Sequence, residues 1–385
     1  MQAEILDLVR SVHKTPHKVV LATAGAGTQA LSDLLAVAGA SNTLLEARVP
    51  YDKSAFVDFV GGEPKKFVSS KAARLLAGSS FHRAQQLSNQ FPDSDHLIGL
   101  ACSASIATNR PKRGDHHAWI VTWQKGRIVQ VHITLEKGKR TRSQEEKLIS
   151  KIMLNLLAQA CDLPNQISLG LSDLDILETQ VIDHTQDVEN FLAGNSGFIG
   201  MYAHGKTKTN GISPKVLMPG SFNPLHAGHT ELAGVASQIL GQPVAFEISA
   251  LNVDKPPLAQ DVVLSRIAQF AGHFPVYVTG APTFLDKARL FAGVTFVVGF
   301  DTAERILMPK YYDNSEADML AALAEIKALG CHFLVAGRKG KDGVYDPPEA
   351  LQAPSSFADL FMPIPDGLFR RDISSTELRR GAGRK

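Results

Sequence analysis

The sequence has few cysteines, no long apolar run and no surplus of charge of one sign. Its three cysteines, Cys102, Cys161 and Cys331, lie far apart in the 385 residues. They therefore indicate neither a zinc cluster nor a disulfide framework, and a reducing compartment fits best. No apolar stretch approaches the roughly 18 residues that cross a bilayer. Forty basic residues stand against 38 acidic ones, a net charge of +2, which creates no field that would attract nucleic acid.

The ends of the chain show no targeting signal. The first seven residues, Met1 to Asp7, carry acids and no basic-then-apolar block, so neither a secretory signal nor a transit peptide is visible. We therefore expect a cytoplasmic protein whose partners include neither membrane nor nucleic acid. The basic end from Arg379 to Lys385 is interpreted as a solvated tail, because positive charge is ordinary near a helix C-terminus.

The apolar share of 44% suits a globular protein, and the length favours two domains. Over residues 1–165, short apolar runs alternate with helical patterns, which predicts an α/β layer fold. The strongest helix pattern runs from Ser143 to Ala160, where Ser143 and Glu146 have the form of a capping box. We expect strands at residues 19–23, 43–49, 96–102, 118–123 and 128–135, a helix at 28–38, and a hairpin turn at 124–127.

The periodicity fades over residues 166–212, and the part from Phe191 to Lys215 is rich in Gly, Asn, Ser, Thr and Lys, which predicts a linker. Residues 213–385 then alternate regularly. Expected strands cover 216–218, 244–248, 276–278, 294–298 and 332–336, and expected helices cover 230–240, 261–271, 284–291 and 316–329. This alternation predicts a parallel sheet with right-handed crossovers, whose ligand site lies at the carboxyl ends of the strands.

The segment after the first of these later strands carries the most chemistry. It reads PGSFNPLHAGH over residues 219–229. Gly220 and Gly228 permit close approach of the backbone to a ligand, and a helix that begins at Thr230 offers an anion site at its N-terminus. His226 and His229 can point into one phosphate-sized space. A His-x-x-His pair is also half of a metal site, but no third ligand stands nearby, and the strand–glycine–helix context favours phosphate.

This segment resembles the nucleotidyltransferase superfamily whose signature is Gly-Ser/Thr-Phe-Asp/Asn-Pro-x-His-x-Gly-His, and every fixed position matches. The sequence ISSTELR at residues 373–379 resembles the Ile-Ser-Ser-Thr-x-Ile-Arg motif of the same superfamily. The resemblance implies a Rossmann-like nucleotidyltransferase domain over residues 213–385. It assigns catalytic roles to His226, His229 and Lys255.

Further site residues come from the same resemblance. We expect nucleotide binding by Gly220, Ser221, Phe222, Asn223, Gly299, Asp301, Ser374, Ser375, Thr376 and Arg379, and acceptor binding by Arg266. Arg338 is expected to bind the acceptor for a different reason: it stands at the end of a later strand and could reach a phosphate. Plain loop charge is the alternative interpretation of Lys255, and helix capping that of Asp301. The expected chemistry is in-line attack of an acceptor phosphate on the α-phosphorus of ATP, with pyrophosphate leaving. Mg²⁺ is expected to arrive bound to the ATP phosphates rather than in a protein site.

The first half resembles the C-terminal domain of the CinA family, some of whose members deamidate nicotinamide mononucleotide. The resemblance lies in LATAGAGT at residues 21–28, in PYDK at 50–53, and in the hairpin and helix from 117 to 160. Ala26 stands where the family has a serine, Phe56 stands where a lysine is expected, and Tyr51 is kept. Because alanine has no hydroxyl to activate, we expect a domain without deamidase activity that serves dimerisation, ligand binding or regulation.

These resemblances together favour an adenylyltransferase acting on nicotinamide or nicotinate mononucleotide in NAD biosynthesis. A transferase for another acceptor, such as phosphopantetheine, is the first alternative. A nucleotide-binding regulator that turns nothing over is the second, and a deamidase with a rearranged site is the third. Small nucleotides are the expected ligands, and a homo-oligomer formed through the N-terminal domain is the expected assembly.

Overall fold

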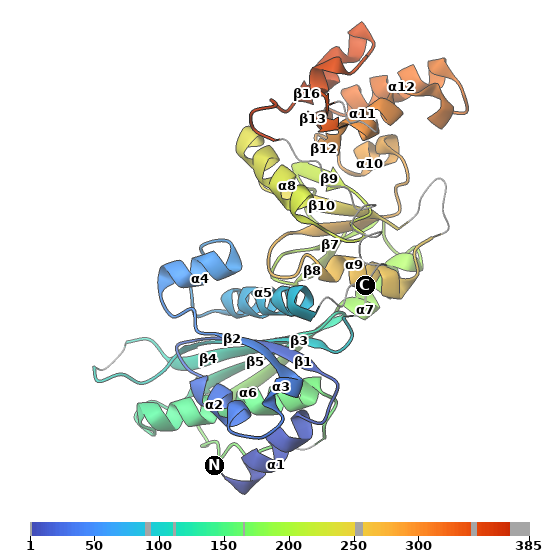
Figure 1. Ribbon diagram of the computed structural model, residues 1–385. Coiled ribbons are helices and arrows are strands. Elements are labelled where there is room, and N and C mark those ends of the chain that lie inside the picture. The colour runs from blue at the N-terminus through green and yellow to red at the C-terminus, as the bar shows by residue number, and fades with distance from the viewer. Residues whose placement is uncertain are drawn as a thin grey trace. The chain divides into compact units, whose positions relative to one another are not determined.

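The computed structural model describes residues 2–88, 94–110, 113–164, 166–250, 257–339 and 345–369, and the chain forms two compact units (Figure 1). The first unit comprises Met1–Asp187, Met201–Thr207 and Ile267–His273. The second comprises Val188–Gly200, Lys208–Arg266 and Phe274–Lys385. The chain therefore passes between the units at several points, whereas the sequence analysis placed one boundary near residue 212.

The first unit is built on a six-stranded sheet of order β2-β1-β3-β4-β5-β6. β1 is parallel to β2 and β3, and the later neighbours pair antiparallel. Its elements are α1 (Ala3–Val12), β1 (Lys18–Ala24), α2 (Thr28–Leu35), α3 (Ala40–Thr43), β2 (Leu44–Arg48), α4 (Lys53–Val60), α5 (Ser70–Ser88), β3 (Leu97–Ser105), β4 (His116–Trp123), β5 (Arg127–Leu135), α6 (Arg142–Ala160) and β6 (Ile176–Asp183). The strands expected in this half are confirmed.

Helices cover both faces of this sheet. One core joins α1, α2 and α6 to the sheet through side chains such as Leu8, Leu34 and Met153. A second core, on the other face, joins α4 and α5 through Phe56 and Phe81. In Figure 1, α5 lies on one side of the sheet, and α1, α2 and α6 lie on the other. The result is a three-layer α/β arrangement.

Helix α5 (Ser70–Ser88) was not anticipated from the sequence. Its buried positions are mostly small side chains, among them Ala72, Ala73 and Ala77, so the large apolar residues that mark a helical stripe are missing. The small residues let α5 lie close to the sheet. A Cβ on Gly99 of β3 would come within 2.1 Å of the Ala77 carbonyl oxygen, and glycine is therefore required there.

The helix start near residue 143 also differs from expectation. α6 begins at Arg142, and its capping box is formed by Thr141 and Gln144 rather than by Ser143 and Glu146. Thr141 accepts from the Gln144 backbone at 3.3 Å, and the Gln144 side chain accepts from the Thr141 backbone at 2.8 Å. Glu146 takes no part in this capping box.

The stretch at 166–212, expected as a linker, contains regular elements. They are β6 in the first sheet, α7 (His184–Leu192), β7 (Phe198–Met201) and β8 (Thr207–Thr209). β6 is an edge strand exposed along almost its whole length. Neither of its faces is buried, so it lacks the alternation that identifies a half-buried strand.

The second unit is built on an eight-stranded sheet of order β16-β13-β12-β9-β10-β11-β7-β8. β9, β10, β11, β12, β13 and β16 run parallel to their neighbours in that series. Its remaining elements are β9 (Val216–Pro219), α8 (Ala227–Leu240), β10 (Val244–Ser249), α9 (Gln260–Ala268), β11 (Val276–Thr279), α10 (Phe284–Leu290), β12 (Thr295–Gly299), α11 (Phe300–Ile306), η1 (Pro309–Tyr311), α12 (Glu316–Ala328), β13 (His332–Ala336), β14 (Arg338–Lys339), β15 (Tyr345–Asp346), η2 (Pro348–Ala350), η3 (Ser355–Leu360) and β16 (Phe361–Pro363). The expected parallel α/β architecture is confirmed.

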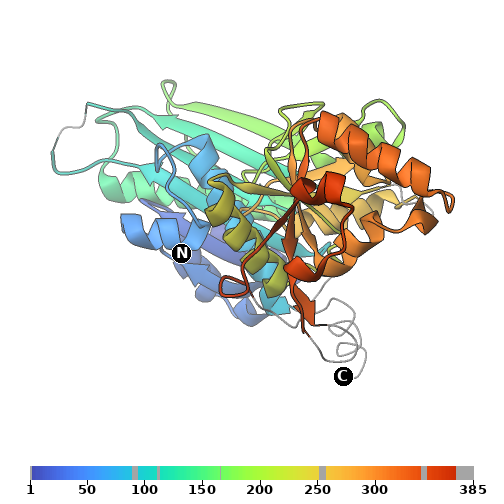
Figure 2. The ribbon, with the colours of Figure 1, turned by 90° about the horizontal axis from the view of Figure 1, so that it is seen from above.

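The strand order of this sheet reverses at β9. The chain moves outward from β9 to β10 and β11, then returns to place β12 on the other side of β9 and continues to β13. Figures 1 and 2 show α8 on one side of this sheet and α12 on the other. In open parallel sheets, a reversal of this kind opens a crevice at the carboxyl ends of the two strands that flank it. Here those strands are β9 and β12.

Within the described residues, no helix combines the length and the apolar character needed to span a membrane.

Candidate functional site

The two predicted histidines are brought together at the carboxyl end of β9. The loop of residues 220–226, hereafter the histidine loop, leads from β9 into α8. The rings of His226 and His229 stack with centroids 3.6 Å apart and planes at 24°. The backbone N–H of His229 donates to the His226 carbonyl at 2.9 Å. The two imidazoles therefore form one rigid pair at the helix N-terminus.

The contact between these histidines defines the tautomer of His229. The backbone N–H of His226 donates to Nδ1 of His229 at 3.3 Å. Nδ1 therefore carries no proton, and in a neutral imidazole the proton lies on Nε2, which becomes a donor. Burial lowers the pKa of His229 to about 3, with the neighbouring His226 adding to the effect. Burial also lowers the pKa of His226, so both rings are neutral at pH 7.

Phe222 supports the pair from inside the protein. Its ring is buried and meets His229 edge-on at 5.0 Å and Phe246 at 5.2 Å between centroids. A Cβ on Gly220 would come within 2.6 Å of the Phe222 ring. Glycine at 220 thus makes room for Phe222, whereas we had expected it to make room for a ligand. Ser221 is exposed and Asn223 is half-buried on the same loop.

The N-terminus of α8 keeps free hydrogen-bond donors. Among the described residues, the backbone N–H groups of Ala227 and Gly228 donate to no acceptor. Unsatisfied N–H groups at the start of a helix, together with the helix dipole, favour an anion. The stacked imidazoles and these N–H groups belong to the same turn of chain.

Two further predicted residues meet at the neighbouring strand ends. Gly299 ends β12 and is the N-cap of α11, with open space where a side chain would stand. Asp301 lies in the first turn of α11 and forms an ion pair with Arg338, which follows β13. Asp301 therefore does not occupy the N-cap position. Because β9, β12 and β13 are adjacent and parallel, these residues share the carboxyl edge of the sheet with the histidine pair.

The remaining predicted site residues are not shown beside the histidine pair, and most of them lie outside the described residues. Arg266 stands half-buried in the last turn of α9, and burial lowers its pKa; its part in acceptor binding stays a prediction. Lys255 and the terminal motif residues Ser374, Ser375, Thr376 and Arg379 lie outside the described residues. Among the described residues, no group of three or more His, Cys, Asp or Glu side chains is arranged to hold a metal ion.

Sequence reasoning missed a buried ionic network beside the histidine loop. Nζ of Lys287 lies 2.9 Å from Oε1 of Glu247, and both side chains are buried. Oε1 also accepts from the Thr279 hydroxyl at 2.5 Å, and the Glu247 carbonyl accepts from the Gly220 N–H at 2.9 Å. The network ties the ends of β9, β10 and β11 together. A glutamate inside the apolar run 244–248 was the signal that pointed to it.

The first unit has an equivalent strand–glycine–helix turn, but a side chain of the same unit fills it. The carboxylate of Glu146 accepts from the backbone N–H of Gly27 at 3.0 Å and of Gln29 at 3.1 Å, and from the Thr28 hydroxyl at 2.9 Å. These donors belong to the N-terminus of α2. An internal anion therefore occupies the position in which a ligand anion would bind.

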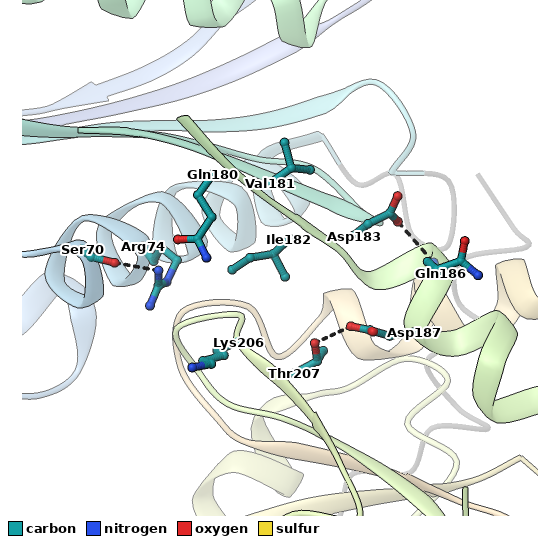
Figure 3. A pocket seen from close by; sticks show the side chains of 10 residues that line it. All are labelled: Ser70, Arg74, Gln180, Val181, Ile182, Asp183, Gln186, Asp187, Lys206 and Thr207. Carbon is teal, nitrogen blue, oxygen red and sulfur yellow. Dashed lines mark hydrogen bonds between the residues drawn. The ribbon is translucent and has the colours of Figure 1, made fainter. Parts of the chain in front are cut away.

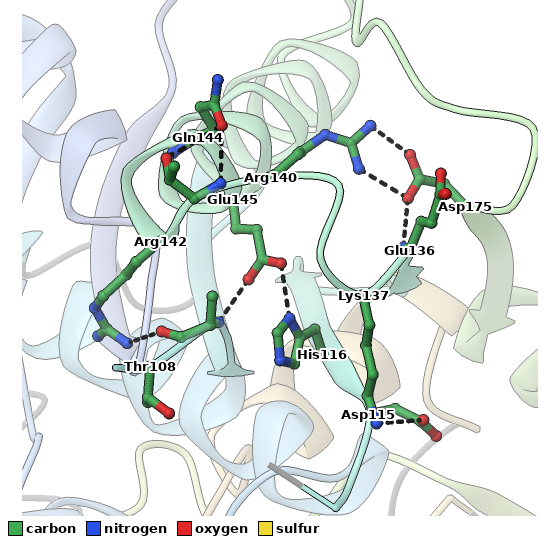
Figure 4. Close-up of polar contacts among 12 residues, drawn as sticks. Thr108, Asp115, His116, Glu136, Lys137, Arg140, Arg142, Gln144, Glu145 and Asp175 are labelled. Carbon is green, nitrogen blue, oxygen red and sulfur yellow. Dashed lines mark hydrogen bonds and ion pairs between the residues drawn. The ribbon is translucent and has the colours of Figure 1, made fainter. Parts of the chain in front are cut away.

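The first turn of α6 also holds the loop that follows β3. Glu145 is fully buried, accepts from the Ala107 N–H at 2.6 Å and lies 2.8 Å from Nδ1 of His116. Arg142 donates to the Ala107 carbonyl at 2.9 Å. Figure 4 shows these contacts converging on the loop after β3. Nearby, Arg140 and Asp175 form a bidentate pair with distances of 2.9 and 2.6 Å.

The positions that depart from the CinA pattern have structural roles. Ala26 is buried in the core of the first unit, and Phe56 is 2% exposed and packs edge-on against Phe67. Tyr51 is 69% exposed. No hydroxyl or cation is thus supplied at positions 26 and 56, and the phenol that is kept points to solvent.

A scan of protein-family models finds none that matches the chain, and no curated protein matches it. Solved structures do match. The competence/damage-inducible protein CihA from Agrobacterium tumefaciens is 18% identical over 42% of this chain and 97% of its own, with a TM-score of 0.33. A CinA-superfamily protein from Escherichia coli is 17% identical over 41% of this chain and 92% of its own, with a TM-score of 0.32. One from Enterobacter cloacae is 14% identical over 40% and 92%, with a TM-score of 0.33. At these values the likeness supports no statement about activity.

Proposed function

We propose that the second unit transfers AMP from Mg–ATP to a mononucleotide or another phosphorylated acceptor, with release of pyrophosphate. Nicotinamide or nicotinate mononucleotide is the acceptor we favour. The observation that carries the proposal is the stacked pair His226–His229 at the N-terminus of α8, where the sheet reverses its strand order. The two motifs that resemble nucleotidyltransferases, at residues 219–229 and 373–379, support the same reaction class.

The proposed step forms one bond and breaks one. An oxygen of the acceptor phosphate attacks the α-phosphorus of ATP, and the bond from that phosphorus to the bridging oxygen of pyrophosphate breaks. Mg²⁺ enters as part of the ATP substrate and neutralises charge on the leaving pyrophosphate. The protein needs no nucleophile, and its contribution is position and charge stabilisation.

The neutral state of the histidines suits this role. Nε2–H of His229 donates to an α-phosphate oxygen as charge develops on it, since Nδ1 is already occupied by the His226 N–H. The free N–H groups of Ala227 and Gly228 hold a second phosphate oxygen. Gly299, which has open space beside it, lets the nucleoside approach the backbone at the end of β12.

For the first unit we propose a role other than deamidation. Its turn at residues 25–29 is occupied by Glu146, and Ala26 offers no hydroxyl for acyl chemistry. Dimerisation, ligand binding and regulation remain open to it. Release of ammonia from nicotinamide mononucleotide by the full chain would contradict this proposal.

The transfer is tested with the full chain, ATP and Mg²⁺, and a panel of acceptors. The panel contains nicotinamide mononucleotide, nicotinate mononucleotide and phosphopantetheine, and both pyrophosphate and the adenylylated product are measured. We expect turnover with one of the two pyridine mononucleotides. Turnover with phosphopantetheine alone would favour the alternative transferase, and ATP binding without any product would favour a nucleotide-binding regulator.

A further inference from the structure

The first unit carries a pocket that the proposed transfer does not use. The pocket has a volume of about 540 Å³ and is formed by the start of α5, the end of β6, the start of α7 and the segment at 206–207. Every lining residue belongs to the first unit. Small-molecule sites have volumes of this order.

The pocket contains a buried cation without an acidic partner. Arg74 is 8% exposed. Its Nε donates to the His204 carbonyl at 3.0 Å, and Nη1 donates to the Ser70 hydroxyl at 2.7 Å and to Oε1 of Gln130 at 2.9 Å. Among the described residues, Nη2 has no acceptor and no carboxylate lies within ion-pair distance. Burial of an unpaired guanidinium destabilises the folded chain, and a bound anion would offset that cost.

The charges in the pocket are arranged by sign. Figure 3 shows Arg74 and Lys206 at one end and Asp183 and Asp187 at the other. Both acids already hold donors of their own. Asp183 accepts from the backbone N–H of Thr185 and Gln186 at 2.9 and 3.2 Å, and Asp187 accepts from the Thr207 hydroxyl.

The neighbouring His204 is affected by the same positive charge. Burial and, after it, the charges of Arg74, Lys71 and Lys206 together lower its pKa to about 4. The charges of several cations therefore act on the His204 ring, and no acid of the described residues raises the pKa of His204.

We propose that this pocket binds a small phosphate monoester, with Arg74 and Lys206 holding the phosphate and the acidic end receiving hydroxyl groups. Nη2 of Arg74 keeps its N–H groups for phosphate oxygens, and a carboxylate accepts hydrogen bonds from the hydroxyls of a sugar. A pocket with a cationic and an acidic end therefore fits a sugar phosphate or nucleoside monophosphate better than a free anion. The lining residues belong to the first unit and the histidine pair to the second, and the proposal does not depend on the transfer reaction.

The test uses the full chain and reads binding at His204, which contacts the lining residues Arg74 and Lys206. The ring resonances of His204 are followed by NMR during titrations with AMP and with inorganic phosphate. We expect saturable shifts and a rise in the pKa of His204, because a bound anion offsets the neighbouring cations. AMP should bind at least about tenfold more tightly than phosphate, since only AMP contacts the acidic end. Equal affinity would overturn the assignment to a monoester.

Variants separate this pocket from the site in the second unit. Lys206→Gln should weaken AMP binding about tenfold as read at His204, the scale expected for one charge-assisted contact. Lys208→Gln changes an exposed lysine two residues after Lys206, on β8, that does not line the pocket, and should leave AMP binding unchanged. Arg74→Lys keeps the charge but loses the Nη2 donors, and should also weaken binding. Absence of any shift at His204, or loss of the shift in His229→Ala but not in Lys206→Gln, would overturn the proposal.

Discussion

Each unit has a glycine-containing turn that connects a parallel strand to a helix N-terminus, and the two turns differ in what occupies them. In the first unit, Glu146 accepts from the backbone N–H groups of Gly27 and Gln29 and from the Thr28 hydroxyl at the start of α2. In the second, the N–H groups of Ala227 and Gly228 at the start of α8 have no acceptor among the described residues. Both helices attract negative charge there, but only the second turn is left for a ligand.

This difference shows that a strand–glycine–helix turn supplies an anion site without deciding which anion binds. A carboxylate of the same chain satisfies the turn permanently, because it is always present at high effective concentration. The second unit instead places the neutral imidazoles of His226 and His229 beside the open turn. Fold alone therefore does not separate an active turn from a structural one.

The largest expected effect comes from removing the imidazoles. His226→Ala and His229→Ala should each lower the rate of pyrophosphate release by about 10²–10³, the usual cost of removing one donor to a developing charge. His332→Ala is the matched control, because His332 is exposed at the opposite end of a parallel strand. Steady-state kinetics and thermal unfolding are measured together. Full turnover in either histidine-pair variant would show that the histidine pair is not the catalytic site.

The next largest effect is the loss of stability of the first unit in acid. Burial lowers the pKa of His204 and His273 in the first unit to about 4 and also lowers those of His82 and His184. Unfolded histidine has a pKa of about 6.5. Between these values the unfolded chain binds more protons than the folded one, so the free energy of unfolding falls as the pH falls from 6.5 toward 4.

This acid effect has a convenient probe. The only two tryptophans of the sequence, Trp119 and Trp123, lie on β4, so urea unfolding followed by fluorescence reports on the first unit. Each unit of pKa difference corresponds to about 1.4 kcal/mol. His204→Gln should reduce the slope of stability against pH, whereas His332→Gln should not. A stability that stays constant from pH 7 to 4.5 would contradict the argument.

Glu146→Gln tests the filled turn directly. Loss of the charge weakens three hydrogen bonds at once, and we expect the free energy of unfolding of the first unit to drop by about 1.5–3 kcal/mol. Glu178→Gln, on the exposed edge strand β6 with a side chain 70% exposed, should change it by less than about 1 kcal/mol. Sulfate should stabilise Glu146→Gln more than the wild type, because the opened turn then accepts an outside anion. Equal stability of the variant and the wild type would show that Glu146 does not hold the turn.

The smallest expected effect concerns the ion pair at the open edge. The side chains of Arg338 and Asp301 are 48% and 43% exposed, so breaking the pair with Arg338→Gln should alter stability by only about 0–1 kcal/mol. We expect the KM for ATP to rise several-fold, because both residues stand beside the crevice. Arg305→Gln, on the same helix as Asp301, is the control. An unchanged KM in Arg338→Gln would place the pair outside the nucleotide site.

Some features of both units could be predicted because they depend on neighbours in the chain. The strands at 244–248 and 332–336 are local apolar runs, and His226 and His229 are close in space because they are close in sequence. Helix α5 escaped prediction because small residues bury it. The pairs Glu247–Lys287 and Asp301–Arg338 each join different parts of the chain, and no local pattern announces such a contact.

Local patterns along the chain were sufficient for the α/β class, the parallel order of the second sheet and the position of the histidine loop, because periodicity and turn chemistry act over a few residues. Long-range packing determines which of the two strand–glycine–helix turns is occupied by a carboxylate of the same chain. Glu146 reaches Gly27 across more than a hundred residues, and Arg74 becomes a buried cation only when α5 lies against the sheet and the segment around His204. Burial and charge pairing are properties of the folded chain, and they set the chemistry that each turn and pocket can perform.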